Sequence, residues 1–140
     1  MTKPILLLLV TIAVFELSNM ILGYDLAYRV GYGAFVLLAL VIAGTFLWLW
    51  KQRSTPLALG MVFSWAGASC VMAWWWLYSL LGAPVWMHDN PLLFVFLSVY
   101  LMGAALHLEV IGRSFALSRF ATFAPIAGAV LISLVVSLMA

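Results

Sequence analysis

Charged side chains are scarce in this sequence. Its 140 residues include six Lys or Arg and four Asp or Glu. Only 7% of the residues are charged, whereas about a quarter of a soluble domain usually is. Hydrophobic residues make up 68% of the chain, and the mean hydropathy is +1.24. One domain of ordinary size cannot hide this much apolar surface in its core. The composition therefore excludes a soluble globular protein and predicts one that is surrounded by lipid.

The chain also has little cysteine and little net charge. Cys70 is the single cysteine, so one chain can form neither a disulfide framework nor a thiolate metal cluster. The net charge is +2 and comes from residues between apolar stretches, which leaves no basic surface for nucleic acid. We therefore expect no nucleic-acid partner and no metal site, and the sequence identifies no cofactor.

What the sequence does contain is a series of long apolar stretches. A helix needs about 20 apolar residues to cross a hydrocarbon core about 30 Å thick. Five stretches have this length, and they cover residues 4–23, 31–50, 57–82, 91–112 and 120–139. Their apolar residues are continuous and do not alternate with polar ones, which argues against a transmembrane β-barrel. We predict an all-α, polytopic transmembrane helical bundle of five spans, forming a single domain over residues 1–140.

The first stretch has some features of a signal peptide, because Lys3 precedes a run of apolar residues. No small-residue cleavage site follows promptly, however. Glu16, Ser18 and Asn19 instead continue into residues 20–23 with helical spacing. We therefore expect a first span that is retained.

Basic residues indicate the orientation of the spans, because Lys and Arg gather at their cytoplasmic ends. With five spans, five of the six Lys and Arg residues fall on one side of the membrane, and only Arg29 falls on the other. The five are Lys3, Lys51, Arg53, Arg113 and Arg119. We predict a cytoplasmic N-terminus and an outside C-terminus in an integral, multi-pass protein of the plasma membrane, which in a bacterium is the inner membrane.

Two connections are predicted on the outer side, at residues 24–30 and 83–90. Aromatic residues gather near the predicted span ends, as in the belts found at membrane interfaces. They include Trp48 and Trp50 in the second span and Trp74, Trp75, Trp76 and Tyr78 in the third. A ligand cage built from the three consecutive tryptophans is the alternative interpretation.

Glu16 is the one charged residue deep within an apolar stretch. A count of about 1.5 Å of rise per residue places it near the membrane midplane. Six other polar residues fall at or near this level: Asn19, Ser69, Cys70, Ser98, Tyr100 and Ser133. An ionisable group at this depth is costly unless it is paired, protonated or facing water. We therefore expect Glu16 to point into the bundle, and we predict that these seven residues bind a ligand.

Three interpretations of Glu16 remain open. A protonated Glu16 that bonds Ser69, Tyr100 or a backbone carbonyl would tie two spans together. A titrating Glu16 would be the proton-linked binding carboxylate of a small-solute transporter. A Glu16 that pairs with another subunit would belong to a membrane complex.

A second polar layer lies about 9 Å from the cytoplasmic edge. It contains Thr11, Thr45, Ser64 and His107. His107 is expected to act as a hydrogen-bonding imidazole. The other histidine, His88, lies roughly 28 Å away along the helix direction, so the two cannot ligate one haem within a subunit. Glu109 and Arg113 are spaced for an ion pair on one helix, and Asp25 and Arg29 repeat this spacing across the predicted outer loop.

Catalytic patterns are missing from the chain. The sequence contains no G-x-S-x-G, H-E-x-x-H, P-loop or G-x-G-x-x-G motif. A nucleophile needs a base within hydrogen-bond reach, yet Ser69 and Cys70 are predicted at a different depth from His107. An intramembrane enzyme is therefore the least favoured class.

Small residues recur at the spacing that lets membrane helices approach closely. They are Gly60, Ser64, Gly67 and Ala68 in the third span and Ala124 and Gly128 in the fifth. We expect a homo-oligomer or a larger membrane complex within the lipid bilayer. The predicted function is that of a non-enzymatic helical subunit or binding module for a membrane partner, a lipid or a cofactor. The alternative is a proton-linked transporter that uses Glu16.

Overall fold

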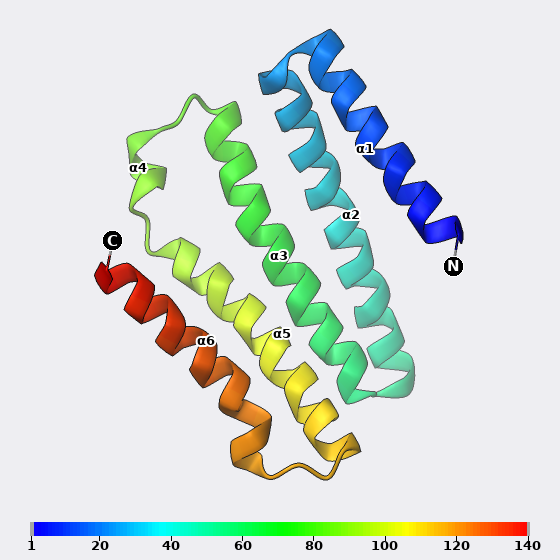
Figure 1. Ribbon diagram of the computed structural model, residues 1–140, viewed down its shortest axis with the longest axis vertical. Helices are drawn as coiled ribbons and strands as arrows, with labels where there is room; N and C mark the ends of the chain where they lie inside the picture. The colour runs from blue at the N-terminus through cyan, green and yellow to red at the C-terminus, as the bar shows by residue number, and fades with distance from the viewer. Residues whose placement is uncertain (1, 140) are drawn as a thin grey trace.

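A computed structural model describes residues 2–139, which are almost entirely helical (Figure 1). The elements are α1 (Thr2–Leu22), α2 (Tyr24–Arg53), α3 (Pro56–Leu80), α4 (Val85–His88), α5 (Leu92–Ser114) and α6 (Arg119–Met139). No strand occurs in this part of the chain. All of these helices except the single turn α4 are long and apolar enough to cross a membrane. The prediction of an all-helical, multi-pass membrane protein is confirmed at this level.

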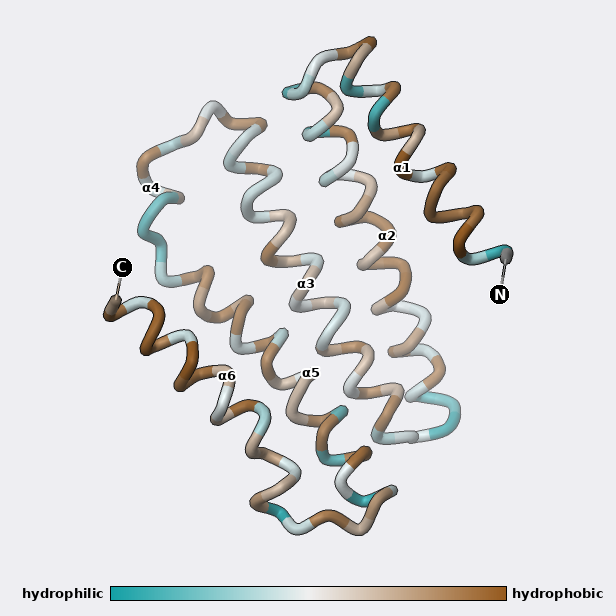
Figure 2. Tube along the Cα trace, in the orientation of Figure 1, coloured by the Kyte–Doolittle hydropathy of each residue, from teal (hydrophilic) through white to brown (hydrophobic). Residues whose placement is uncertain are grey.

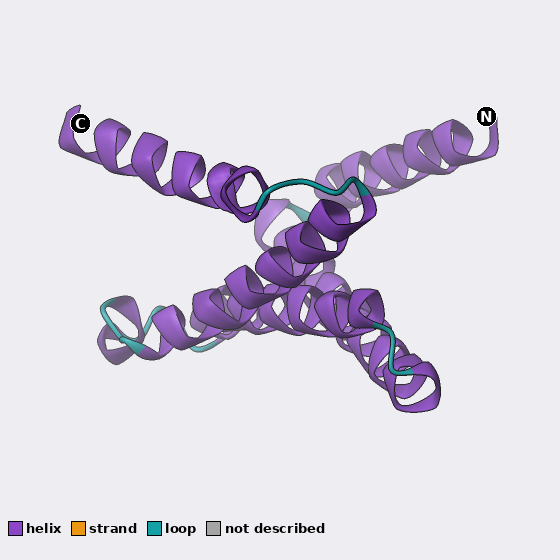
Figure 3. Cartoon of the chain, turned by 90° about the horizontal axis from the view of Figure 1, so that it is seen from below, coloured by secondary structure: helices purple, strands orange, loops and turns teal. Residues whose placement is uncertain are grey.

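The long helices follow one another in a row in chain order, and each reverses the direction of the one before (Figure 1). The extensive contacts are those of α3 with α2 and with α5. Two smaller contacts attach α1 to α2 and α6 to α5. Figure 3 shows α1 and α6 leaving the other helices on the same side and diverging from one another. The packed core is therefore α2, α3 and α5, with α1 and α6 as outer helices.

Small residues explain how α3 and α5 approach so closely. A methyl group added at Gly67 would lie 2.5 Å from the backbone nitrogen of Tyr100. One added at Gly103 would overlap Ser64. The small residues of the third span, which were predicted to allow close helix contact, thus form a contact within the chain. The small residues of α6 form no such close contact at Gly128, since nothing in the described chain lies within 4 Å of a methyl group added there.

The largest error in the predicted boundaries concerns the first connection. Residues 24–30 were expected to form an outer loop, but α2 already begins at Tyr24. Gly23 makes the turn alone because its φ of +78° is accessible to glycine without strain. At about 1.5 Å per residue, α2 is about 45 Å long and exceeds the hydrocarbon core. Asp25 and Arg29 therefore lie on a helix that extends beyond the apolar region. The other four predicted spans agree closely with the observed helices.

The connection between α3 and α5 is held in place by Trp74. This residue is buried, and its indole Nε1 donates a hydrogen bond to the carbonyl oxygen of Met87, at 3.2 Å. Its ring meets those of Trp86 and Phe96 edge to face. Met87, on α4, is only 2% exposed. Trp74 is therefore a packing residue, and its buried ring is not available as the wall of an open ligand cage.

Hydrophilic residues gather at the turns and helix ends, and hydrophobic residues follow the helices between them (Figure 2). The predicted ion pair between Glu109 and Arg113 forms near the end of α5. Asp25 and Arg29 form no such pair among the described residues. Because few charged residues lie along the spans, a charged side chain in the middle of a long helix is unusual in this chain.

Candidate functional site

The hairpin of α1 and α2 encloses the candidate site. Gly31 on α2 makes room for the Phe15 ring, since a methyl group at Gly31 would lie 2.7 Å from Phe15 Cε1. This contact brings one face of α1 against α2 at the level of Phe15. Glu16 and Asn19 are one and four residues further along α1, so the same contact sets their positions beside α2.

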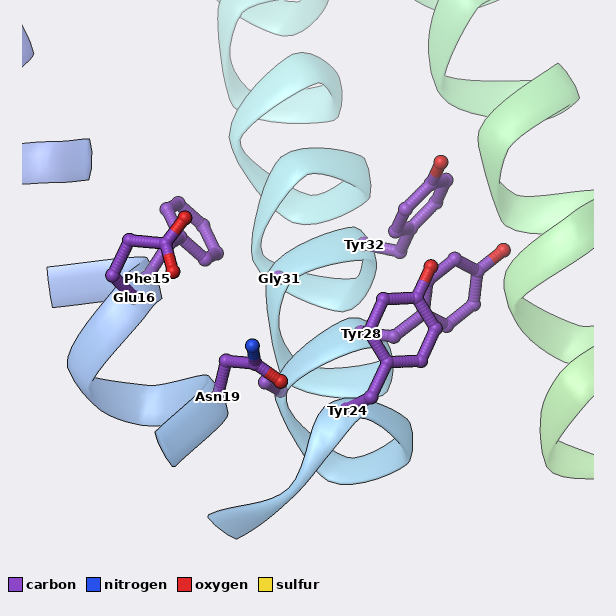
Figure 4. A pocket seen from close by; sticks show the side chains of 8 residues that line it. Phe15, Glu16, Asn19, Tyr24, Tyr28, Gly31 and Tyr32 are labelled. Atoms are coloured by element: carbon purple, nitrogen blue, oxygen red, sulfur yellow. The ribbon is translucent and has the colours of Figure 1, made fainter. Parts of the chain in front are cut away.

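An open cavity of about 360 Å³ lies beside this contact, large enough for a small chemical group or a side chain. It is lined by Phe15, Glu16 and Asn19 of α1 and by Tyr24, Ala27, Tyr28, Gly31 and Tyr32 of α2. Figure 4 shows the α1 residues on one side and the three tyrosines along α2 on the other. The cavity thus combines a carboxylate, an amide and three phenols with apolar walls.

Glu16 is the chemically distinctive member of this set. It is exposed, and its carboxylate makes no hydrogen bond or ion pair with the residues that the structure describes. Neighbouring Ser18, by contrast, donates its hydroxyl to the Val14 carbonyl on the same helix, at 2.7 Å. Glu16 was expected to point into the bundle, but α1 is an outer helix. The carboxylate therefore lies in a groove at the edge of the bundle.

The three tyrosines form a ladder along α2. The rings of Tyr24 and Tyr28 are stacked with centroids 6.1 Å apart, and those of Tyr28 and Tyr32 are 4.1 Å apart. Their spacing of four residues puts all three on one face of the helix. The ladder was missed because residues 24–30, which include Tyr24 and Tyr28, were assigned to a loop and so were separated from Tyr32 in the predicted second span. The repeated four-residue spacing was the available signal.

The other five residues predicted to bind a ligand are placed elsewhere. Ser69 is only 1% exposed, and its hydroxyl donates to the Val36 carbonyl on α2, at 3.0 Å. Ser98 donates to the Phe94 carbonyl on its own helix. Cys70 lies part-buried on α3, Tyr100 is 45% exposed on α5, and Ser133 is exposed on α6.

The α1–α2 cavity contains Glu16 and Asn19 and none of these five residues. No hydrogen bond joins Glu16 to Ser69 among the described residues, and the Ser69 hydroxyl instead joins α3 to the Val36 carbonyl of α2. Ligand binding by the seven residues stays a prediction, and the structure groups only two of them in this cavity.

The second polar layer is also divided. Ser64 Oγ and His107 Nδ1 are 3.4 Å apart across the contact of α3 with α5, in agreement with a hydrogen-bonding imidazole. The Nε2 atom of His107 is buried without a hydrogen-bond partner in the described chain. Thr11 and Thr45 each donate to a carbonyl on their own helix. Of the four residues of this second polar layer, only Ser64 and His107 therefore interact across two helices.

His88 and Asp89 form a close pair of potential metal ligands. His88 Nδ1 lies 2.9 Å from Asp89 Oδ1 in the connection after α4. Among residues 2–139, no three His, Cys, Asp or Glu side chains gather closely enough to hold a metal ion.

Comparisons with known proteins found no relative that suggests a function. No family model matches the sequence, and neither the curated proteins nor the solved structures contain a match.

Proposed function

We propose that the protein is a non-enzymatic binding module of the membrane, whose α1–α2 cavity receives a basic side chain from a transmembrane helix of a partner protein. The observation that carries this proposal is the unpaired carboxylate of Glu16 beside an open cavity. Ionisable residues within membrane spans generally pair with one another or face water. A Lys or Arg on the partner helix would supply the missing pair.

The surroundings of Glu16 suit a basic side chain. Asn19 offers an amide oxygen one turn away on the same face of α1. The tyrosine rings on α2 offer faces that attract cations, with the strongest effect where water is excluded. The cavity lining contains no Lys or Arg that would repel the incoming group.

The outer position of α1 favours a partner helix over a small solute. None of the apolar window of α1 is buried, and the helix contacts α2 weakly. Its leucines are exposed around its circumference, for example Leu7 at 69% and Leu8 at 59%. A helix lying against α1 would cover this surface and place its own side chain in the cavity.

The proposed orientation follows from the five-to-one distribution of Lys and Arg, with the N-terminus cytoplasmic and the C-terminus outside. The protein would then be an integral protein of the plasma membrane, or of the inner membrane in a bacterium. Glu16 would lie in the outer half of the membrane, about 9 Å of helical rise before Leu22. The partner's basic residue is proposed at that depth.

A proton-linked transporter using Glu16 is the alternative, and the packing gives it less support. A transporter must open its site to both sides of the membrane. The Glu16 cavity lies between α1 and α2 at one end of the hairpin, whereas Gly67 and Gly103 pack tightly against α5 and α3. A binding role needs no passage through this packed region.

The test is purification of the tagged protein from its native membranes, with quantitative mass spectrometry of what remains bound. Glu16→Gln removes the charge and keeps the size, so it should lower retention of the partner by about tenfold, equal to about 1.4 kcal/mol. Asp89→Asn is the matched control, because it removes the same charge from an exposed loop residue. It should retain the partner fully.

The retained partner must itself carry a Lys or Arg within a transmembrane helix, and neutralising that residue should reproduce the loss. Homogeneous wild-type protein without a second chain would contradict the proposal. So would equal retention by wild type and Glu16→Gln.

A further inference from the structure

A second groove lies at the opposite end of α2 from the Glu16 cavity. It runs between the last turns of α2 and the first turns of α3 and has a volume of about 540 Å³. Its deeper walls are mainly apolar and include Phe46 and Leu49 of α2 and Leu57 and Met61 of α3. His107 of α5 also lines the groove, and its ring is the one polar group on the deeper walls. Arg53, the last residue of α2, and Thr55, just before α3, supply its polar end.

The charge of this groove is positive and uncompensated. Arg53 is exposed and forms no ion pair with the described residues. The groove lining contains no Asp or Glu. Lys51, two residues before Arg53, points to another face of α2 and does not line the groove, so Arg53 is its one Lys or Arg residue. The Thr55 hydroxyl makes no hydrogen bond to the start of α3 and is free to donate one.

The arrangement of polar and apolar parts matches the chemistry of a lipid. Arg53 is the last residue of α2, where the apolar span ends and the headgroup region begins. Phe46 lies about 10 Å of helical rise deeper in the membrane. A ligand that follows the groove would therefore place an anionic group at the interface and a hydrocarbon chain among apolar side chains.

We propose that this groove binds one anionic phospholipid, with its phosphate at Arg53 and Thr55 and one acyl chain along Phe46, Leu49 and Met61. Basic pockets between transmembrane helices bind anionic lipid headgroups in this way. A zwitterionic lipid lacks the net negative charge that complements Arg53. The site is independent of the partner proposed for Glu16.

The neighbouring surface provides a matched control. Arg113 lies at the same end of the molecule, but Glu109 pairs with it and neutralises its charge. Both residues line the adjoining groove between α3 and α5. That groove should have no preference for an anionic headgroup, so Arg113→Gln and Arg53→Gln differ in their expected effect.

The experiment is native mass spectrometry of the purified chain mixed with phosphatidylglycerol and phosphatidylcholine of the same acyl chains. Wild type should hold one phosphatidylglycerol at least tenfold more often than one phosphatidylcholine, and added salt should reduce this preference by screening. Arg53→Gln should abolish the preference. Arg53→Lys should retain part of it, because the charge remains, and Arg113→Gln should leave it unchanged.

Equal occupancy by the two lipids in wild type would overturn the proposal, even if a variant failed to fold. A preference that persists in Arg53→Gln, or disappears equally in Arg113→Gln, would overturn the assignment to this groove. Thermal unfolding of each variant in detergent establishes that the compared proteins are folded.

Discussion

The Phe15 ring occupies the space above Gly31 where the β-carbon of any other residue would lie. This contact couples the position of α1 to a single glycine on α2. Because Glu16 follows Phe15 directly, the position of the carboxylate depends on the same contact. Because α1 makes few contacts with the rest of the chain, it is easily displaced. Substitutions at the contact of Phe15 with Gly31 are therefore expected to alter partner binding more than the free energy of unfolding.

Gly31→Ala tests this coupling. The added methyl group must push the Phe15 ring aside, and a flexible ring end on a loosely packed helix can move at low cost. We expect the free energy of unfolding to change by less than about 1 kcal/mol, while partner retention falls as strongly as in Glu16→Gln. Reversible unfolding in mixed micelles and the retention assay measure the two effects. A large loss of stability with normal retention would contradict the coupling.

Gly67→Ala should behave in the opposite way. Its methyl group would meet the backbone of Tyr100 in the core contact of α3 with α5, and backbone cannot move aside as a ring can. Overpacking of this kind costs about 1–3 kcal/mol. Gly128→Ala is the control, because its methyl group meets nothing in the described chain. Equal unfolding free energies for the two variants would show that α3 and α5 pack loosely at this point.

Ser69→Ala removes the hydroxyl that joins α3 to the Val36 carbonyl of α2. Hydrogen bonds between membrane helices contribute about 0.6 kcal/mol on average and at most about 1.7 kcal/mol in comparable measurements. We expect a loss in this range, measured by unfolding in mixed micelles. Ser98→Ala should cost less, since Ser98 bonds only its own helix. If Ser98→Ala is the more damaging change, the role given to Ser69 is wrong.

Trp74→Phe removes the hydrogen bond to Met87 and preserves an aromatic ring. The lost bond should cost about 1 kcal/mol and loosen the connection that contains α4. Hydrogen exchange of residues 85–90 should become faster, and Trp75→Phe should leave it unchanged. Unaltered exchange in Trp74→Phe would mean that packing alone holds the connection.

Proteoliposome flux distinguishes binding from transport. A binding module should show no flux driven by a pH gradient for cationic, neutral or anionic solutes, and Glu16→Gln should behave as wild type does. Flux that depends on the pH gradient and disappears in Glu16→Gln would favour the transporter.

The helical class and the long spans could be predicted because continuous apolar segments of this length, in a chain with so little charge, are stable only in lipid. The start of α2 could not be predicted. Asp25 and Arg29 are charged and suggest a loop, because the sequence does not show how far a helix continues beyond the membrane. The direction in which the Glu16 side chain points could not be predicted either. It depends on which helix faces α1, and the sequence does not specify that pairing. Depth counting placed seven polar residues at similar levels but gave no information on which helices are neighbours.

The most direct test of the proposed binding role places a photo-crosslinking amino acid at Tyr28, within the cavity but on α2, and irradiates native membranes. We predict one cross-linked partner that carries a transmembrane Lys or Arg, and we predict that Glu16→Gln abolishes this product. The same amino acid at Ser98, exposed on α5, should not yield it. A product that persists in Glu16→Gln, or that forms equally from Ser98, would contradict the assignment of the Glu16 cavity as the partner site.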